Sequence, residues 1–399
     1  MQGSWRRLIV TGVLLGAACE AAPSIPEEGE AVTSQHRRRG YHVIKLRSLG
    51  GAVSGANSIN NLGWVTGTST TTDGTTRAAL WLFGWKLDLG TLGGPNSGVI
   101  WPVKNDIGAI SGIAQTAELD PHGEDWSCSA FLPDTGHVCR GFVWERGEMR
   151  PLPTFGGTHG FATGTNNRRE TVGWAENTVR DPSCTSPQIF QFRAALWGPG
   201  RDQIRALPPF GDDSTSAATA INDSGQVVGI SGACGAAVGS VSAAHALLWE
   251  DGVPTDLGNL GAIYWNTPMA INRHGDVVGF ANNPALAIPA TLFRPLAFLW
   301  TEESGGMTSL GTLSGDPLAT SQALGINARR QIVGLSCLSG ACSAYLWDGG
   351  AMTDLNTLVT SGDREHLFAA GDINDLGIIT GQTLAEDGTQ SAFIAIPLP

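Results

Sequence analysis

One short pattern recurs seven times along the chain and limits what the chain can fold into. Each copy begins with an asparagine and has a glycine seven residues later, as Asn222 and Gly229 do in "INDSGQVVG". The spacing between copies averages roughly 52 residues, which is in the range of β-propellers and other repeat arrays. The seven copies begin at Asn60, Asn105, Asn166, Asn222, Asn272, Asn327 and Asn374.

The pattern itself predicts a tight β-hairpin. Asn222 is suited to start a type I turn, because its side chain can bond the backbone two residues further on. Gly225 then takes the left-handed position that closes a three-residue hairpin loop with a bulge. In two copies an arginine, Arg169 or Arg330, stands at that position and would adopt a positive φ at a cost of about 1 kcal/mol. The shape of those two turns can therefore differ from the others.

Two further blocks follow each turn and complete a four-stranded unit. The unit around the fourth asparagine reads as strand a over 216–222, strand b over 226–231, strand c over 244–249 and strand d over 254–260. Four short strands per repeat, stacked radially, make a propeller blade. Strand a lines the channel of such a ring, and its residues are mostly small and neutral, which argues against a charged catalytic centre inside.

A tryptophan ends strand c in six of the units. Six tryptophans at one repeat position could form a ring that stacks against a ligand. A tryptophan at the end of an apolar strand more often packs between neighbouring sheets, and packing is the interpretation we favour. The six residues are Trp81, Trp144, Trp197, Trp249, Trp300 and Trp347.

The two ends of the repeat region complement each other. The last unit stops after strand c, whereas residues 42–51, "HVIKLRSLGG", form a strand d block with no blade before it. Together they complete one blade, which closes a ring and leaves no free sheet edge. We therefore predict an all-β, seven-bladed β-propeller over residues 41–399, with four strands per blade and the last blade closed by the N-terminal strand.

The repeat resembles a known family. The stretch "SAATAINDSGQVVG" followed by "HALLWEDGVPTDLGNLG" is similar to the HAF extracellular repeat, which is named after a His-Ala-Phe that often opens its third strand. His245 and Ala246 keep two of those three letters, and Leu247 replaces the Phe. The resemblance covers roughly residues 41–399 and implies an exported bacterial repeat protein. It implies no catalytic residue.

The N-terminus reads as an export signal. Residues 1–18 combine a basic start with a short apolar run, too short to span a bilayer, and small residues follow. Cys19 ends "LLGAAC", which resembles a bacterial lipobox and predicts lipid attachment. The alternative is cleavage near Ala22 and full secretion. Residues 19–40 have almost no bulky apolar side chains and read as a disordered tether. The protein is thus expected in the outer membrane as a lipoprotein, or outside the cell.

The charge of the chain argues against nucleic acid as a partner. The formal net charge is −12 and the isoelectric point is near 5.1, so a basic footprint for nucleic acid is absent. We expect contact with a membrane only through the lipid anchor, and a monomeric protein. The ligand, a glycan or a protein, is not identified by composition.

Repeat lengths vary at one place. From each asparagine to the next tryptophan the separation ranges from 20 to 39 residues, but from tryptophan to the next asparagine only from 22 to 27. The insertions therefore lie between strands b and c, whose loops share one face of a propeller with the d–a loops. Insertions collected on one face often mark a binding face.

Six cysteines lie in these b–c loops. An exported protein favours disulfides, and no CxxC pattern supports a metal site. Proximity within the predicted fold gives three pairs, one of which joins adjacent blades. The pairs are Cys128–Cys139, Cys337–Cys342 and Cys184–Cys234.

The longest insertion, residues 115–139, is the best candidate site. Its carboxylates, imidazole and indole are suited to bind Ca²⁺ through oxygen ligands or a sugar ring through the indole. No EF-hand spacing is present, and a solvated loop held by its disulfide is the alternative. Asp212 and Asp213, in a d–a loop, could join the same face or serve only as turn residues. The insertion contributes Glu118, Asp120, His122, Glu124, Asp125 and Trp126.

No catalytic motif is present, so no residue is assigned a catalytic role. No cofactor is expected apart from a possible Ca²⁺. Three functions remain open: a binding module for an extracellular glycan, peptide or envelope protein; a structural surface or assembly protein; and an enzyme that acts on extracellular polysaccharide.

Overall fold

The computed structural model describes residues 40–399 apart from 125, 201, 236–237 and 284–292. The predicted signal peptide, the tether up to residue 39, the lipidation site Cys19 and the candidate residue Asp125 lie outside the described residues. None of the helices in the described part is long and apolar enough to cross a membrane.

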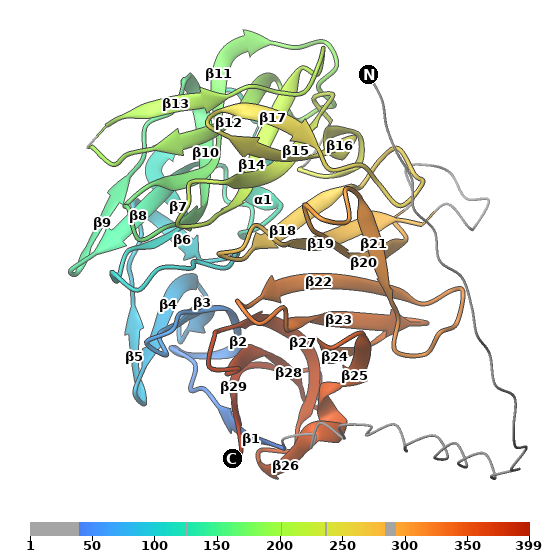
Figure 1. The fold of residues 1–399 in the computed structure, drawn as a ribbon. Coiled ribbons are helices and arrows are strands. Elements are labelled where there is room, and N and C mark those ends of the chain that lie inside the picture. The colour runs from blue at the N-terminus through green and yellow to red at the C-terminus, as the bar shows by residue number, and fades with distance from the viewer. Residues whose placement is uncertain (1–39, 125, 201, 236–237, 284–292) are drawn as a thin grey trace, which may run out of the picture. The chain divides into compact units, whose positions relative to one another are not determined.

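Seven sheets follow one another around a ring, from blue to red in Figure 1, and form a seven-bladed β-propeller. Six blades contain four consecutive strands each, in the order a, b, c, d from the channel outwards. Blade 1 has β2 (Gly50–Ile59), β3 (Val65–Thr71), β4 (Thr76–Leu82) and β5 (Trp85–Asp88); blade 2 has β6 (Gly93–Gly98), β7 (Ile110–Leu119), β8 (His137–Glu145) and β9 (Glu148–Pro151); blade 3 has β10 (Gly156–Thr165), β11 (Thr171–Arg180), β12 (Phe190–Trp197) and β13 (Ile204–Leu207). Blade 4 has β14 (Thr215–Ile221), β15 (Val227–Gly232), β16 (His245–Glu250) and β17 (Val253–Asp256); blade 5 has β18 (Thr267–Ile271), β19 (Val277–Asn282), β20 (Pro295–Trp300) and β21 (Met307–Gly311); blade 6 has β22 (Thr320–Ile326), β23 (Ile332–Leu338), β24 (Ala341–Asp348) and β25 (Ala351–Asp354).

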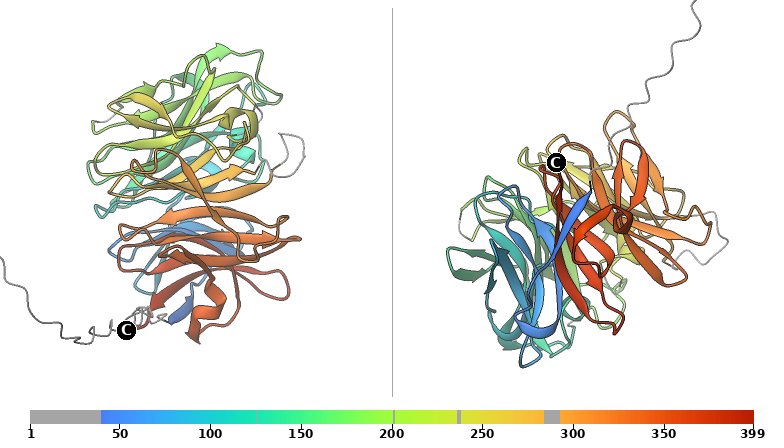
Figure 2. Two further views of the ribbon diagram at one scale, coloured as in Figure 1. Left: turned by 45° about the vertical axis from the view of Figure 1, so that its right-hand side comes forward. Right: turned by 90° about the horizontal axis from the view of Figure 1, so that it is seen from below.

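Blade 7 confirms the predicted closure by both ends of the chain. It contains β27 (His366–Ile373), β28 (Ile379–Leu384) and β29 (Gln390–Pro397), and β1 (Tyr41–Lys45) pairs antiparallel with β29 from the N-terminal end. The view from below in Figure 2 shows the blue β1 beside the red C-terminal strands. The blade also has a fifth strand that the sequence did not predict: β26 (Val359–Gly362) pairs parallel with β1 and covers the outer edge.

Three short helices complete the secondary structure of the described residues. They are α1 (Trp126–Ser129), η1 (Ser240–Ala243) and η2 (Leu355–Leu358). The first two lie in b–c loops. We call the face that carries the b–c and d–a loops the loop face, and the opposite face, with the a–b and c–d hairpin turns, the turn face.

The repeated asparagine forms the predicted a–b turn. The Asn222 Oδ1 atom accepts the N–H groups of Ser224 and Gln226 at 3.1 Å each, and Gly225 has a φ of 86°. The shape is the same where arginine replaces this glycine, since Arg169 and Arg330 have φ values of 63° and 58° and close the turn with the same backbone hydrogen bond. The expectation that these two turns could differ in shape is therefore wrong.

Each arginine also binds a carboxylate that offsets its backbone strain. The Arg330 guanidinium binds Asp276 of blade 5 through two hydrogen bonds of 2.8 and 2.9 Å. Arg169 binds Glu145 of blade 2 through a single guanidinium nitrogen, which lies 2.5 and 2.7 Å from the two carboxylate oxygens. The Arg330 pair is bidentate and therefore stronger than a single hydrogen bond, and both arginines add a side-chain contact between blades that a glycine cannot make.

The repeated tryptophans pack between blades, as the favoured interpretation predicted. Trp249 is 1% exposed, and its indole N–H donates to the Pro208 carbonyl of blade 3 at 2.8 Å. Trp81 and Trp197 make the same contact with the preceding blade. The hydrophobic core is accordingly divided into clusters that lie largely between sheets, for example around Ile271, Phe298 and Trp300.

Candidate functional site on the loop face

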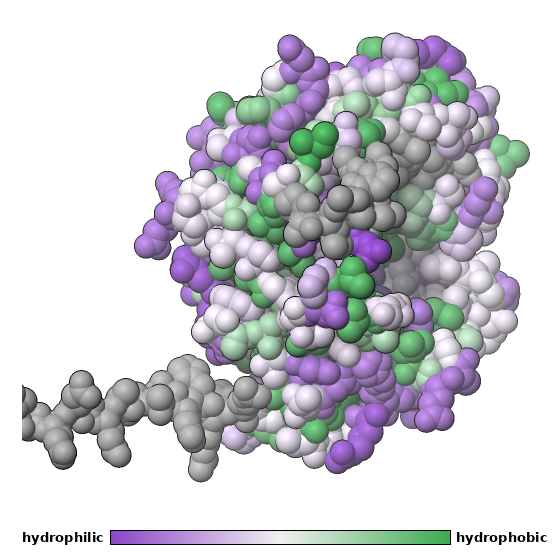
Figure 3. Space-filling view, turned by 90° about the vertical axis from the view of Figure 1, so that its right-hand side faces the viewer, coloured by the Kyte–Doolittle hydropathy of each residue, from purple (hydrophilic) through white to green (hydrophobic). Residues whose placement is uncertain are grey.

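The loop face carries the irregular part of the molecule. Figure 3 shows this face, with hydrophilic and hydrophobic residues interspersed over it. All three predicted disulfides are present: Cys128–Cys139, Cys184–Cys234 and Cys337–Cys342. The second joins the b–c loops of blades 3 and 4, as expected. Three disulfides are compatible with an exported protein.

Two b strands project beyond the blades at this face. β7 and β11 both have ten residues, and in each the last residues turn from buried to exposed. Leu119 at the end of β7 and Val179 near the end of β11 are at least half exposed. These overhanging ends of blades 2 and 3, residues 117–119 and 178–180, form what we call the ridge.

The loop after β7 folds back against blade 3 through buried polar groups. The Asp120 side chain is 1% exposed, and its Oδ2 atom lies 3.7 Å from Nε2 of His159, which is also 1% exposed. Asp120 also accepts backbone N–H bonds from His122 and Glu124. Burial opposes its ionisation, but the His159 side chain and these N–H groups lower the pKa of Asp120 to about 2.

Glu124 connects this loop to the next blade. Its side chain is fully buried, and Oε2 accepts the N–H groups of Ile189 and Phe190 at 2.9 and 3.1 Å. Its Oε1 atom has no hydrogen-bond partner among the described residues. Burial, with the charge of Glu176 added, raises the pKa of Glu124 to about 7. Its protonation state therefore changes near neutral pH.

The partners of these two carboxylates come from strands a and b of blade 3. His159 Nδ1 accepts the Cys139 N–H at 3.1 Å, so in the neutral ring Nε2 carries the proton and faces Asp120. Burial alone would lower the pKa of His159, but Asp120 and Glu176 outweigh it and raise that pKa. Glu176 in turn accepts the backbone N–H of His159 at 2.7 Å and a side-chain amide N–H of Gln188 at 2.9 Å. We call Asp120, Glu124, His159, Glu176 and Gln188 the buried latch.

The buried latch is closed to solvent, so its chemistry is structural. It fixes the long insertion of blade 2 against blade 3. His159, Glu176 and Gln188 are not among the residues predicted from the sequence. A signal was available for Glu176, because it stands ten residues after its asparagine, where blade 2 has the buried Gln115. A charged residue near the end of a buried strand needs partners.

The other predicted site residues are scattered. Glu118 is exposed near the end of β7, and His122 is exposed on the loop that follows, where its ring meets Phe190 edge-on at 5.1 Å. Trp126 begins α1, and its side chain lies outside the described part. Asp212 is exposed. The structure thus brings together only Asp120 and Glu124 from the predicted set.

Asp213 is more than a turn residue. Its Oδ2 atom lies 2.8 Å from His245 Nδ1 and accepts the Ser231 hydroxyl at 2.6 Å. These contacts lie within blade 4, and none of those described joins Asp213 to the buried latch. The His245 side chain remains 34% exposed, so its second nitrogen can reach solvent.

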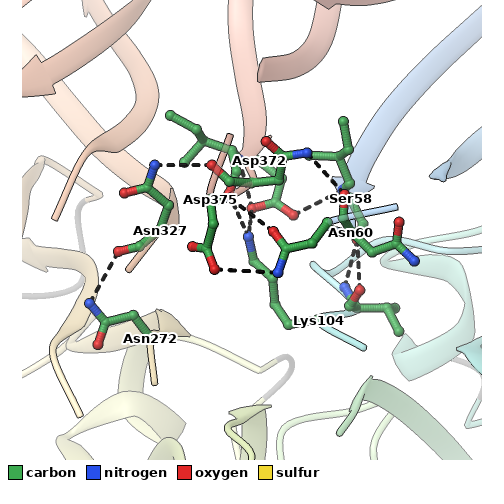
Figure 4. Close-up of polar contacts among 12 residues, drawn as sticks. Ser58, Asn60, Lys104, Asn272, Asn327, Asp372 and Asp375 are labelled. Carbon is green, nitrogen blue, oxygen red and sulfur yellow. Dashed lines mark hydrogen bonds and ion pairs between the residues drawn. The ribbon is translucent and has the colours of Figure 1, made fainter. Parts of the chain in front are cut away.

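The channel ends at the turn face in a ring of asparagine side chains. Each of the seven asparagines donates its amide N–H to a backbone carbonyl of the next blade at 3.0–3.1 Å. In six cases this carbonyl belongs to the next asparagine, and Asn105 uses Thr165 instead. The asparagine ring, part of which Figure 4 shows, therefore explains why the residue is repeated.

A charged pair lies inside the channel, contrary to the expected neutral lining. Lys104 of blade 2 lies 2.5 Å from the buried Asp372 of blade 7, and Asp372 also accepts the N–H of Ile59 in blade 1 at 3.0 Å (Figure 4). The pair thus joins three blades where the ring closes. Burial raises the pKa of Asp372, against the opposing effect of the Lys104 ammonium group.

The channel is a poor ligand site. Its turn-face cavity has a volume of about 180 Å³ and is lined by the asparagines and the residues that follow them. Small-molecule sites typically measure about 300–1,000 Å³. Within the described part of the chain, no three His, Cys, Asp or Glu side chains are arranged to hold a metal ion.

No protein-family model and no curated protein matches the chain. The resemblance to the HAF repeat therefore stays a prediction.

Comparison with solved structures finds distant likenesses. The Pyrococcus horikoshii acylaminoacyl peptidase aligns at 11% identity and a TM-score of 0.46, over 83% of this chain and 49% of the peptidase, so this chain spans about half its length. An oligogalacturonate lyase from Vibrio parahaemolyticus aligns at 9% identity and a TM-score of 0.47, over 90% of each chain. Trypanosoma rangeli sialidase in complex with sialic acid aligns at 11% and 0.40, over 88% of this chain and 59% of the sialidase. Likenesses this distant carry no argument about activity.

Proposed function

We propose that the chain is an exported binding module that holds an extracellular glycan, peptide or envelope protein at the ridge of its loop face. The observation that supports this is the fixed geometry of the variable loops. Two of the disulfides, Cys128–Cys139 and Cys184–Cys234, and the buried latch hold the long b–c insertions, whereas Cys337–Cys342 joins two paired strands of blade 6. A surface ordered before binding loses less entropy when the ligand arrives, which favours affinity.

The composition of the ridge suits such contacts. Leu119 and Val179 offer exposed apolar area, while Glu118, His122 and Arg180 stand beside them. Arg180 also lies over the Phe190 ring, 5.2 Å from its centroid, which holds the guanidinium in place. Apolar side chains among oriented polar ones are typical of recognition sites.

A binding screen tests the proposal. The oxidised protein from residue 19 onward is applied to glycan arrays, with Ca²⁺ and with EDTA, and crosslinked to envelope proteins in intact cells. The ridge variant Leu119→Asp/Val179→Asp should lose at least tenfold in affinity, about 1.4 kcal/mol. Val253→Asp, an exposed residue of the turn face, is the matched control and should bind normally. Equal binding by both variants would exclude the ridge.

Two other functions have distinct signatures. A structural assembly protein would show a stable envelope partner or self-association and no soluble ligand. The Asp213–His245 pair favours an enzyme, since a carboxylate on Nδ1 leaves Nε2 as a base. Turnover of a polysaccharide that disappears in His245→Gln, with an unchanged Tm, would support the enzyme and contradict the binding module.

A further inference from the structure

The turn face is not uniform around the ring. The third residue of each asparagine turn lies at its tip, and blades 7, 1 and 2 have Leu376, Leu62 and Ile107 there. Both leucines are more than half exposed, and Ile107 is half-buried. The remaining blades carry polar residues at the same position. These are Arg168, Ser224, His274 and Arg329.

Blade 1 adds two aromatic side chains at its c–d turn. Phe83 and Trp85 are each 81% exposed. Phe83 has a φ of 47°, a left-handed conformation that a bulky side chain rarely adopts. Arg146 and Asp251 occupy the equivalent turn position in blades 2 and 4, where a polar residue fits an exposed hairpin tip. An aromatic pair held outward at a strained turn indicates a contact that the propeller itself does not make.

These side chains belong to adjacent blades. The Asn61 N–H donates to Asp106 at 3.0 Å, and the Asp375 N–H donates to Asn61 at 2.9 Å, so the turns of blades 7, 1 and 2 lie side by side. The cavity at this end of the channel is lined by residues of the same turns. Leu376, Leu62, Ile107, Phe83 and Trp85 together form what we call the apolar arc.

The chain enters the propeller beside the apolar arc. β1 begins at Tyr41, whose hydroxyl donates to the Gly377 carbonyl in the a–b turn of blade 7 at 3.3 Å. Gly40 is held there as well, because its carbonyl accepts the Leu398 N–H at 2.8 Å. The 39 residues before Gly40 therefore join the molecule at the turn face, next to Leu376.

We propose that the apolar arc docks on a lipid surface and turns the loop face away from it, so that membrane contact extends beyond the lipid anchor expected from the sequence. The sequence predicts a lipid anchor at Cys19, and residues 19–39 span at most about 70 Å when extended. The segment joins the propeller at the edge of the turn face, so a bilayer that holds Cys19 would lie within reach of this face. Trp and Phe with exposed Leu suit the interface between lipid headgroups and acyl chains. A net charge of −12 favours a zwitterionic surface over an anionic one.

A vesicle sedimentation experiment tests this docking without the anchor. The chain from residue 19 onward with Cys19→Ala, which cannot be lipidated, is mixed with phosphatidylcholine vesicles. Binding is expected and should be insensitive to salt, since it comes from apolar burial. Phe83→Asp/Trp85→Asp should weaken it at least about tenfold, because both apolar rings that would be buried in the lipid are replaced by charged side chains. Val253→Asp, at the position of Trp85 in blade 4, should bind like the parent.

A fluorescence measurement locates the contact and does not depend on a disruptive variant. Brominated lipid should quench part of the tryptophan emission of the Cys19→Ala chain. Adding Trp85→Phe keeps an apolar ring at the tip, so vesicle binding should persist while this quenching disappears. Absence of vesicle binding by the Cys19→Ala chain, or quenching that survives Trp85→Phe, overturns the proposal. If the parent self-associates and Phe83→Asp/Trp85→Asp abolishes this, the apolar arc binds a second copy of the chain instead of lipid. If the parent binds a soluble glycan through the apolar arc, its ligand is a sugar instead of lipid.

Discussion

The turn face and the loop face are built from the same seven repeats, but they are held together differently. On the turn face each asparagine side chain bonds the backbone of its own turn and of the next blade. Changing one turn therefore disturbs its neighbour. A b–c loop has only to connect two antiparallel strands, so it can lengthen freely. The loops of the loop face accordingly differ in length from blade to blade. Disulfides and buried charged groups hold them in place of the repeated hydrogen bonds of the turn face.

The two faces should also differ in how much stability is lost when one residue is changed. On the turn face, many neutral hydrogen bonds of about 1 kcal/mol each are spread around a closed ring. On the loop face, stability depends on a few strong constraints between particular residues. Removing one such constraint should therefore matter more, and at more predictable places, than changing one turn.

The largest effect is expected for the disulfide between blades 3 and 4. Cys184 and Cys234 are 50 residues apart, so replacing both by alanine should lower the free energy of unfolding by about 4 kcal/mol. The control pair, Cys337 and Cys342, closes a separation of 5 residues and should cost only about 2 kcal/mol. Urea unfolding of both variants measures the difference. Equal losses of unfolding free energy in the two variants would show that these disulfides do not stabilise the protein through the loop-closure entropy of the unfolded chain.

The ion pair in the channel should be second. Asp372→Ala leaves the Lys104 ammonium group and the Ile59 N–H without their buried partner, at a cost of about 3 kcal/mol in unfolding free energy. Asp375→Ala, at the exposed turn two residues beyond the end of β27, should cost about 1 kcal/mol or less. If both variants unfolded at the same urea concentration, the ring would not depend on this pair for closure.

The buried latch should make stability depend on pH. The pKa of Glu124 in the folded protein is raised to about 7, so the proton binds the folded state more tightly than the unfolded one. The stabilisation is complete below the ordinary carboxyl pKa and is lost as the pH rises through 7. The free energy of unfolding should fall by about 2 kcal/mol more between pH 5 and 8 in the parent than in Glu124→Gln.

Amide hydrogen exchange tests the same prediction at the residues that contact Glu124. The Ile189 and Phe190 amides bond Glu124, and their protection should decrease with pH in step with the Glu124 titration. Identical pH profiles for the parent and Glu124→Gln would show that this carboxyl does not titrate near neutrality.

The smallest effect is expected at an arginine turn. Arg330→Gly relieves the strain of a positive φ, worth about 1 kcal/mol, but removes the bidentate contact with Asp276, so its net effect should stay within about 1 kcal/mol. Arg330→Lys keeps the strain and cannot form the planar two-bond contact. Thermal unfolding should therefore rank Arg330→Lys below Arg330→Gly, and the reverse order would mean that the strain is negligible.

The same contrast explains what the sequence could predict. The blades, their closure and the disulfides could be predicted because the chain repeats itself. Each repeat has an asparagine like Asn222, and six have a tryptophan like Trp249, so the same turn and strand are indicated many times. Lys104, Asp372 and His159 occur once each and meet through segments far apart in the chain. Asp372 did offer a signal: two residues before the asparagine, blades 4 and 5 have Ala220 and Ala270. A charge in that place requires a partner, but its identity depends on the curvature of the closed ring.

The closing strand also decides how the molecule responds to mechanical force. A pull on the segment before Gly40 enters through β1, which runs antiparallel to β29 over five residue pairs from Tyr41 to Lys45. The hydrogen bonds of such a ladder stand perpendicular to the strands. Force along β1 therefore loads them together, in shear, instead of opening them one after another. A force on the N-terminal segment therefore acts directly on the strand that closes the ring, and β26, which pairs with the other edge of β1, bears part of the load.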